Sequence, residues 1–282
     1  YSRSGRMILD IAVNDLINGG GKRLRPLLLL LSAEFGDGDK DKLLPMAAGV
    51  EFLHMATLIH DDIIDEAELR RGKMTAQEKF GKNAAVFVGD FLLTKAYSLF
   101  ADYLSRESLL KLNKVVSLIC IGEIDQFEGK YNTDLSVNDY LKRIRRKTAL
   151  LFALCSYIGA YETGVRGRDL YNLYKFALEL GMSFQIQDDL LDFTGNKIKI
   201  GKEADQDLIT GIYTLPIILL LKKDNYKERA SYLLSKEYLG EKEISEIKEL
   251  LLESGTLLDS RNIAEKFLGR AEKYLERLPE NR

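Results

Sequence analysis

The chain has 282 residues, with 41 lysines and arginines against 43 aspartates and glutamates, and 46% of its residues are hydrophobic. This balance of charge argues against a nucleic-acid-binding protein, which carries a basic surface. The hydrophobic content can fill a sizeable core, and no apolar run reaches the roughly 18 residues that span a bilayer. No transmembrane segment or secretion signal is evident, and we expect a cytoplasmic protein.

The sequence predicts an all-α fold. Only four prolines interrupt it, and the apolar residues recur with helical rather than alternating spacing. Ser136 is a predicted N-cap with Asp139 in the first helical turn. No linker, repeat or change of composition divides the chain, so we expect one domain, residues 1–282, built as a single bundle of long helices around a central cavity. The expected helices are 3–18, 24–35, 41–64, 75–103, 108–131, 136–161, 167–192, 211–222, 245–253 and 256–278.

Cysteine and histidine offer little for a metal site. Cys120 and Cys155 lie far apart in apolar stretches, so we expect two free core cysteines in a reducing compartment. His54 and His60 are six positions apart, which is not the i, i+4 spacing of a helical zinc pair.

Two copies of the pattern Asp-Asp-x-x-Asp stand inside predicted helices, at 61–65 and 188–192. The first and last carboxylates of each copy share a helix face. Such carboxylates repel one another unless a cation lies between them, and Mg²⁺ is held by carboxylate oxygens together with phosphate oxygens. A solvated acidic surface is the alternative, but both copies lie in apolar sequence. The candidate metal ligands are Asp61, Asp62, Asp65, Asp188, Asp189 and Asp192.

Cations cluster at two further places. The segment 20–26, with the sequence GGKRLRP, puts Lys22, Arg23 and Arg25 at a predicted helix start, where backbone amides favour anions. A solvated basic turn is the alternative, and the spacing of a Walker loop is absent. Arg70 and Arg71 follow the first aspartate cluster, where they could neutralise its carboxylates or bind the phosphates of a ligand.

Other polar residues accompany the clusters. His54 lies two helical turns before Asp61, and Gln185 lies three residues before Asp188, each on the face of its cluster. A lone helical histidine is more often structural, and His54 stands out only because its helix face carries the cluster. No serine or cysteine has the context of a nucleophile–base pair. Metals, cations and apolar walls therefore favour departure of diphosphate from an apolar molecule, with water excluded from the carbocation.

Together these motifs resemble the trans-isoprenyl diphosphate synthase (polyprenyl synthetase) family over nearly the whole chain. The pattern is closest to long-chain members such as heptaprenyl and octaprenyl diphosphate synthases. The resemblance rests on 20–26, 61–65 with Arg70-Arg71-Gly72, Val88-Gly89-Asp90, Lys147-Thr148, 184–192, Gly201-Lys202 and Thr214-Leu215-Pro216. It implies an isoprenoid synthase-like helical bundle, usually a homodimer. It also implies a head-to-tail condensation, in which an allylic diphosphate ionises and isopentenyl diphosphate attacks the cation, so that the chain grows by five carbons.

The resemblance also implies residue roles. Asp61 and Asp65 would bind Mg²⁺ on one wall and Asp188 on the other, with the remaining three aspartates in support and about three Mg²⁺ per active site. The residues implied for isopentenyl diphosphate are Lys22, Arg25, His54 and Arg71. Those implied for the allylic diphosphate or the nascent cation are Arg70 and four candidate catalytic residues, Lys147, Thr148, Gln185 and Lys202.

Product length is predicted from the positions just before the first cluster. Family members that stop early tend to carry an aromatic residue four or five positions before it, where this chain has Thr57 and Ala56. Small side chains there predict a long product, about six to eight isoprene units. Tight packing of Ala56 against a neighbouring helix is the alternative. Ile212 stands where the family often has a lysine, and Met74 where it favours a proline.

Other functions remain open at this point. They are a farnesyl or geranylgeranyl diphosphate synthase, a catalytic subunit that needs a small partner, and a class I terpene cyclase. A cyclase has no need of a second diphosphate site, which the basic segment 20–26 would provide. An inactive regulatory subunit usually has degraded aspartate motifs, and both motifs are intact here.

Overall fold

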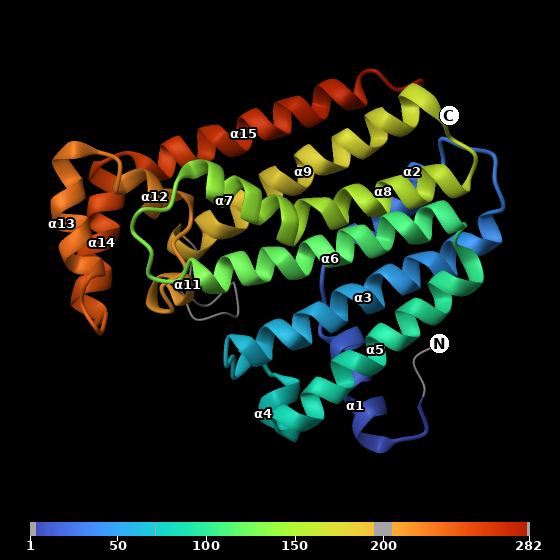
Figure 1. Cartoon of the computed structure of the whole chain (residues 1–282), viewed down its shortest axis with the longest axis horizontal. Helices are drawn as coiled ribbons and strands as arrows, with labels where there is room; N and C mark the ends of the chain where they lie inside the picture. The colour runs from blue at the N-terminus through green and yellow to red at the C-terminus, as the bar shows by residue number, and fades with distance from the viewer. Residues whose placement is uncertain (1–3, 71, 195–204, 281–282) are drawn as a thin grey trace.

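The computed structural model of the chain describes residues 4–70, 72–194 and 205–280 and is almost entirely helical (Figure 1). The all-α prediction is confirmed. Among the described residues the only strands are β1 (Leu69–Arg70) and β2 (Lys73–Met74), which pair antiparallel with Leu69 opposite Met74. The helical elements are α1 (Met7–Asn18), α2 (Leu24–Ala33), η1 (Lys40–Lys42), α3 (Leu43–Ile64), α4 (Ala76–Phe80), α5 (Lys82–Tyr103), α6 (Arg106–Glu128), α7 (Val137–Ile144), η2 (Arg145–Ala149), α8 (Leu150–Glu162), α9 (Gly167–Thr194), α11 (Gln206–Ile209), α12 (Leu215–Leu220), α13 (Asp224–Leu234), α14 (Glu241–Glu253) and α15 (Thr256–Leu275).

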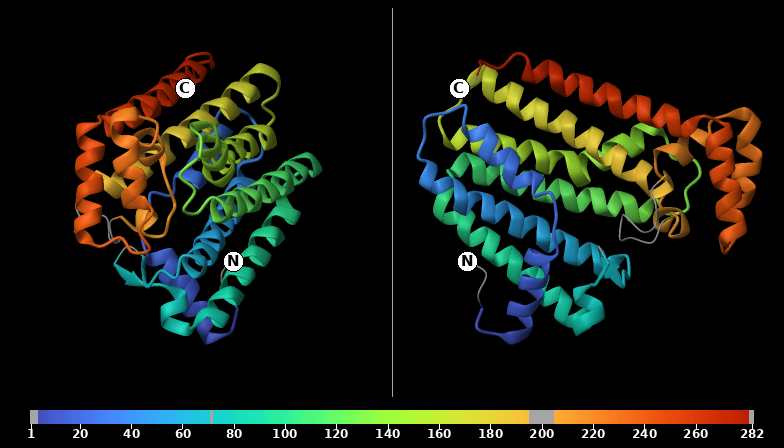
Figure 2. Two further views of the ribbon diagram at one scale, coloured as in Figure 1. Left: turned by 60° about the vertical axis from the view of Figure 1, so that its left-hand side comes forward. Right: turned by 180° about the vertical axis from the view of Figure 1, so that it is seen from behind.

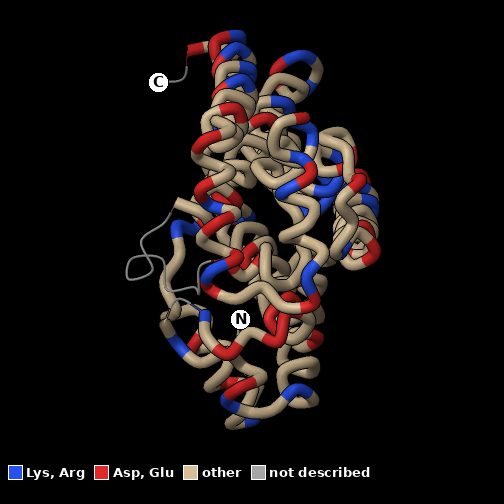
Figure 3. The backbone as a smooth tube through the Cα atoms, turned by 90° about the vertical axis from the view of Figure 1, so that its left-hand side faces the viewer, with Lys and Arg blue, Asp and Glu red and all other residues tan. Residues whose placement is uncertain are grey.

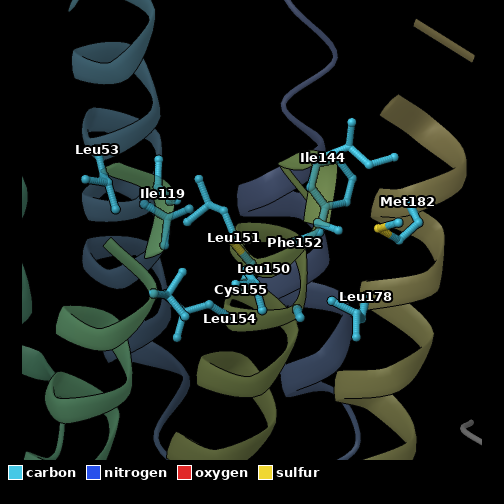
Figure 4. Packing of buried hydrophobic residues seen from close by; sticks show 14 of the residues in the cluster. Leu53, Ile119, Ile144, Leu150, Leu151, Phe152, Leu154, Cys155, Leu178 and Met182 are labelled. Atoms are coloured by element: carbon cyan, nitrogen blue, oxygen red, sulfur yellow. The ribbon is translucent and has the colours of Figure 1, made fainter. Parts of the chain in front are cut away.

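Long helices lie side by side in the bundle (Figures 1 and 2). Helix α3 packs against α5, α9 packs against α15, and α8 lies between α2 and α9. Helices α13 and α14 form a hairpin at one end of the bundle, beside α11 and α12 (Figure 1). Buried side chains from several long helices meet in the centre, among them Leu53, Ile119, Leu151 and Met182 (Figure 4).

The segment that leads into α8 has local signals that the sequence predicts well. Ser136 caps α7, because its hydroxyl accepts from the amide of Asp139 at 3.1 Å while the Asp139 carboxylate accepts from the amide of Ser136 at 3.2 Å. Such a cap is worth about 1 kcal/mol. The helix continues through a π-helical turn, η2, into the buried α8. Turns of this kind occur often at functional sites, and this one carries Lys147 and Thr148.

Several predicted boundaries are wrong for identifiable reasons. The expected helix 75–103 is two helices, because Gly81 has φ +86° and ends α4 before α5 begins. The expected helix 211–222 begins only at Leu215, where Pro216 occupies the first turn. Helix α13 was not predicted, although its buried residues Ala230, Leu233 and Leu234 have helical spacing. Of the two cysteines, Cys155 is buried as expected, whereas Cys120 is exposed.

Two helices of the described chain, α3 and α5, are long and apolar enough to cross a membrane by length and composition alone. They pack against each other in the bundle. Most of α3 is buried inside the protein, and its last turn carries aspartates. Both properties are typical of a helix in the core of a bundle.

Candidate active site

A cavity of about 1230 Å³ lies between α3, α6, α9 and the segment that precedes α2. Acidic and basic segments lie next to each other in the view from the end of the bundle that carries α13 and α14 (Figure 3). The fold brings fourteen predicted site residues to this cavity: Lys22, Arg25, His54, Thr57, Asp61, Asp62, Asp65, Arg70, Lys147, Thr148, Gln185, Asp188, Asp189 and Asp192. Ala56 does not line it, and Arg71 and Lys202 lie outside the described residues.

The first aspartate cluster ends α3, and its members differ in their surroundings. Asp62 is buried, and its Oδ1 accepts from the Arg70 guanidinium, from Nε at 2.7 Å and from Nη2 at 2.6 Å. Asp61 and Asp65 share the face that lines the cavity. Burial raises the pKa of Asp61 to about 6; Lys147 opposes this shift, and Glu123 adds to it. The surroundings of Asp61 therefore disfavour its ionised form, chiefly through burial.

The second cluster, on α9, faces the same cavity. Asp188 is exposed, whereas Asp189 is buried and both of its carboxylate oxygens accept hydrogen bonds. The Tyr140 hydroxyl donates to Oδ2 at 2.6 Å, and the Gln185 amide donates to Oδ1 at 2.7 Å. Burial raises the pKa of Asp189 to about 7, with the neighbouring Asp207 adding to the shift. The Thr148 hydroxyl in turn donates to the Gln185 carbonyl oxygen at 2.6 Å.

The three cations of the basic segment before α2 have different partners. Arg23 is paired with Glu51 and also donates to the backbone oxygen of Ile17. Arg25 Nη1 lies 3.0 Å from His54 Nε2, and because a guanidinium can only donate, the imidazole nitrogen accepts. Lys22 is exposed at the cavity. Lys22 and Arg25 are thus the cations of this segment that a bound anion could meet.

The structure adds site residues that the sequence did not indicate. Lys147 Nζ donates to Glu123 of α6 at 2.8 Å, so this ammonium is already paired with a carboxylate at the cavity. Tyr140 lies seven residues, or two helical turns, before Lys147, and that spacing could have drawn attention to it. Arg143 is buried and donates to the backbone oxygen of Tyr213 at 2.7 Å, which ties α7 to the segment before α12. No signal in the sequence marks Glu123 or Arg143.

Ile212 is buried and lines the cavity, so an apolar side chain stands where the family often has a lysine. Thr214, two residues further on, and Asp207, five residues earlier, line the cavity too. This part of the wall therefore presents an apolar side chain and a carboxylate.

The positions linked to product length lie on different faces of α3. Ala56 is fully buried and lies on the face between Gly49 and His60. That face is packed against α5, because a side chain on Gly49 would collide with Phe100 and the His60 ring lies against Gly89. Thr57 is half-buried and lines the cavity. The geometry therefore favours the packing alternative for Ala56 and leaves Thr57 beside the cavity.

The carboxylates at the cavity suit hard divalent cations only when a bound ligand supplies further oxygen atoms. Carboxylates from α3 and α9 line one cavity, and carboxylate oxygens are the protein ligands that hard divalent cations prefer. Among the described residues, no three side chains of the types that bind metals converge closely enough to hold an ion by themselves. Mg²⁺ accepts such a partial set when phosphate oxygens and water complete its six-fold shell.

The pattern of one protein family, Polyprenyl synthetase, matches residues 6–251. The chain belongs to this family. It is similar to heptaprenyl diphosphate synthase component 2 of Bacillus subtilis (strain 168), with 36% identity over 99% of this chain and 80% of that protein. It is also similar to octaprenyl diphosphate synthase of Haemophilus influenzae, with 33% identity over 94% of this chain and 81% of that protein.

Solved structures agree with this family membership. The crystal structure of heptaprenyl diphosphate synthase from Staphylococcus aureus matches with a TM-score of 0.94 and 32% identity, over 99% of this chain and 88% of that one. The family and the isoprenoid synthase-like fold expected from the sequence are both confirmed.

Proposed function

We propose that this polyprenyl synthetase is an Mg²⁺-dependent prenyltransferase that condenses isopentenyl diphosphate with an allylic diphosphate. The product would be a long all-trans polyprenyl diphosphate of about six to eight isoprene units. The observation that carries the proposal is one cavity lined by both aspartate clusters, with cations at its rim and apolar side chains on its walls. The relatives named heptaprenyl and octaprenyl diphosphate synthase support a long product.

The carboxylates would hold the metal ions through the outward members of each cluster. Asp61, Asp65 and Asp188 are the proposed direct ligands, since Asp62 and Asp189 are occupied by hydrogen bonds from protein donors. When bound, about three Mg²⁺ would neutralise the charge that develops on the departing diphosphate. Arg70 is held against Asp62 at the cavity and would contact the same diphosphate.

Two diphosphates require two sites, and the cations divide between them. Lys22, Arg25 and His54 line one side of the cavity and would hold isopentenyl diphosphate. Lys147, Thr148 and Gln185 lie beside the aspartates and would face the allylic group. Arg71 and Lys202 remain proposals from the resemblance, one for each site.

The reaction would proceed in three events. The allylic carbon–oxygen bond breaks and the electron pair leaves with the diphosphate. The isopentenyl double bond attacks the cation and forms the new carbon–carbon bond. A proton then leaves the condensed product, with the released diphosphate as the proposed acceptor. Leu151, Phe184 and Ile119 line the cavity and would keep water away from the cation.

The direct test is incubation of the pure protein with Mg²⁺, isopentenyl diphosphate and farnesyl diphosphate, followed by sizing of the products. Products of about 30 to 40 carbons would support the proposal. Products of 20 carbons would favour the shorter-chain alternative. Cyclic hydrocarbons formed without isopentenyl diphosphate would identify a terpene cyclase.

A partner subunit is the alternative that the relatives raise, because the Bacillus subtilis protein is named component 2. Activity of the pure chain alone would exclude this requirement. If the chain binds farnesyl diphosphate without turnover, and activity appears only with a second protein from its source, the heteromeric alternative would replace the simple one.

We propose a homodimer formed through α5 and α6. Large apolar side chains are exposed along both helices, among them Phe87 at 67% and Phe127 at 64% exposure. Ile121 and Ile124 of α6 are exposed as well. Exposed apolar patches of this kind mark protein interfaces. Sedimentation equilibrium would test the dimer, and Phe127→Glu should shift it toward monomer. We place this enzyme in the cytoplasm, in line with its free cysteines.

A further inference from the structure

We propose that Tyr140 is a positioning residue for the condensation, acting through Asp189 and Gln185 on the hydroxyl of Thr148. This inference rests on the proposed function and adds to it a residue that lies outside the aspartate motifs. Tyr140 is 1% exposed and does not line the cavity, so it cannot touch a substrate. Its influence must pass through its neighbours.

The connection is a continuous chain of three hydrogen bonds across the bundle. It runs from the Tyr140 hydroxyl to Asp189 Oδ2 at 2.6 Å, and from the Gln185 amide to Asp189 Oδ1 at 2.7 Å. It ends at the Thr148 hydroxyl, which donates to the Gln185 carbonyl oxygen at 2.6 Å. The four residues come from α7, α9 and the π-helical turn η2.

This chain of hydrogen bonds fixes which way each polar group points. Asp189 accepts at both oxygens, so the amide side of Gln185 must face it and the carbonyl side must face Thr148. The proton of Thr148 is then committed to Gln185. A hydroxyl that has donated its proton has only lone pairs to offer, and these would stabilise a developing allylic cation rather than bind a diphosphate oxygen.

Close packing makes this orientation rigid. A side chain on Gly181 would lie 2.7 Å from the Cα of Ala149, so only glycine lets α9 approach η2 so closely. Gln185 follows Gly181 by one helical turn, and Thr148 precedes Ala149. The hydrogen bond between Gln185 and Thr148 therefore lies next to this close backbone approach.

Without its hydroxyl, Tyr140 would leave Asp189 Oδ2 buried with no donor from this side. The carboxylate could then rotate toward the cavity, where the Gln185 amide would follow it and release Thr148. Release of Thr148 acts on the chemical step more than on substrate binding.

The test is Tyr140→Phe, which keeps the ring and removes one hydroxyl. We expect kcat to fall about tenfold, as for the loss of a hydrogen bond to a charged group, with the KM of both substrates changed less than about twofold. Tyr157→Phe is the matched control, because Tyr157 is also buried and donates to a carboxylate, Glu107, at 3.1 Å, but does not line the cavity. It should lower Tm without lowering kcat.

A double-mutant cycle with Thr148→Val shows whether Tyr140 acts through Thr148. If it does, adding Tyr140→Phe to Thr148→Val should lower kcat no further, while Thr148→Ser should retain most of the activity. Additive losses, or normal kcat in folded Tyr140→Phe, would overturn the proposal. If Tyr140→Phe does not fold, Gln185→Leu interrupts the same chain next to Thr148, and its cycle with Thr148→Val has the same two outcomes. If the wild-type protein turns over and Tyr140→Phe has the same kcat, this inference alone is refuted. If the wild-type protein does not turn over, the proposed function is refuted with it.

Discussion

Replacing Thr57 by phenylalanine should shorten the product, because this position lines the cavity four residues before Asp61. Four residues of helix span about 6 Å, which places a new ring one to two isoprene units below the metal-binding carboxylates. A growing chain of six to eight units would meet that ring. We expect products of about three or four units instead, measured by chromatography of the dephosphorylated products.

The fold should tolerate this change. The Thr57 hydroxyl only donates to the backbone oxygen of His54, one turn back in its own helix, at 2.8 Å. Such a bond adds little to stability, so its loss should cost less than about 1 kcal/mol. Thr57→Val, which removes the hydroxyl without adding bulk, should leave product length unchanged.

Ala56→Phe puts the same ring one residue away, and we expect a different result. Ala56 is fully buried on the face toward α5, so the ring would overpack that contact at a cost of about 1–3 kcal/mol. For 282 residues this corresponds to a fall in Tm of roughly 2–5 °C. Full-length products from active Thr57→Phe would refute this account of the channel. Short products from Ala56→Phe with an unchanged Tm would show that the chain grows along the α5 side instead.

Three further predictions concern the metals, the basic segment and the cysteines. In steady-state assays, Asp61→Ala or Asp188→Ala should lower turnover by about three or more powers of ten, and removal of Mg²⁺ by EDTA should abolish turnover reversibly. Near-normal turnover in either folded variant would contradict the metal site. Lys22→Ala and Arg25→Ala should raise the KM for isopentenyl diphosphate roughly tenfold to a hundredfold, since a charged hydrogen bond is worth about 1.5–3 kcal/mol. A change in the KM for the allylic diphosphate alone would mean that the two diphosphate sites are assigned the wrong way round. Burial raises the pKa of the Cys155 thiol to about 12, so its reactive thiolate is scarce at pH 8, whereas Cys120 is exposed. Mass spectrometry after iodoacetamide treatment at pH 8 should therefore show no adduct on Cys155 in the native protein and an adduct on it in urea, and an adduct on native Cys155 would show that this thiol is accessible.

The fold was largely predictable because its determinants are local. Helical periodicity identifies the long helices, and the cap at Ser136 is correct to the residue. The errors arise where a single residue overrides the period, as Gly81 does between α4 and α5. One helix, α13, was missed although Tyr226, Ala230, Leu233 and Leu234 recur along it with helical spacing. Exposure of Cys120 follows from the apolar surface along α6, which a pattern of hydrophobicity cannot distinguish from core.

The aspartate motifs show which features of the active site can be predicted from the sequence and which cannot. Within each copy, the first and last aspartates share a helix face. Helical geometry therefore predicts that these two side chains line the same cavity. The middle aspartate must point elsewhere, and its partner decides what it does. Asp62 meets Arg70 only eight residues further on, a partner that the sequence itself suggests. Asp189 meets Tyr140, which is 49 residues away on another helix, and no local pattern connects the two. Two identical motifs are thus held by a local ion pair in one case and by a hydrogen-bond chain across the bundle in the other. Removing the partner should therefore have unequal effects. Loss of Arg70 removes a cation from the buried Asp62 carboxylate, whereas loss of the Tyr140 hydroxyl disturbs Gln185 and Thr148 as well as Asp189.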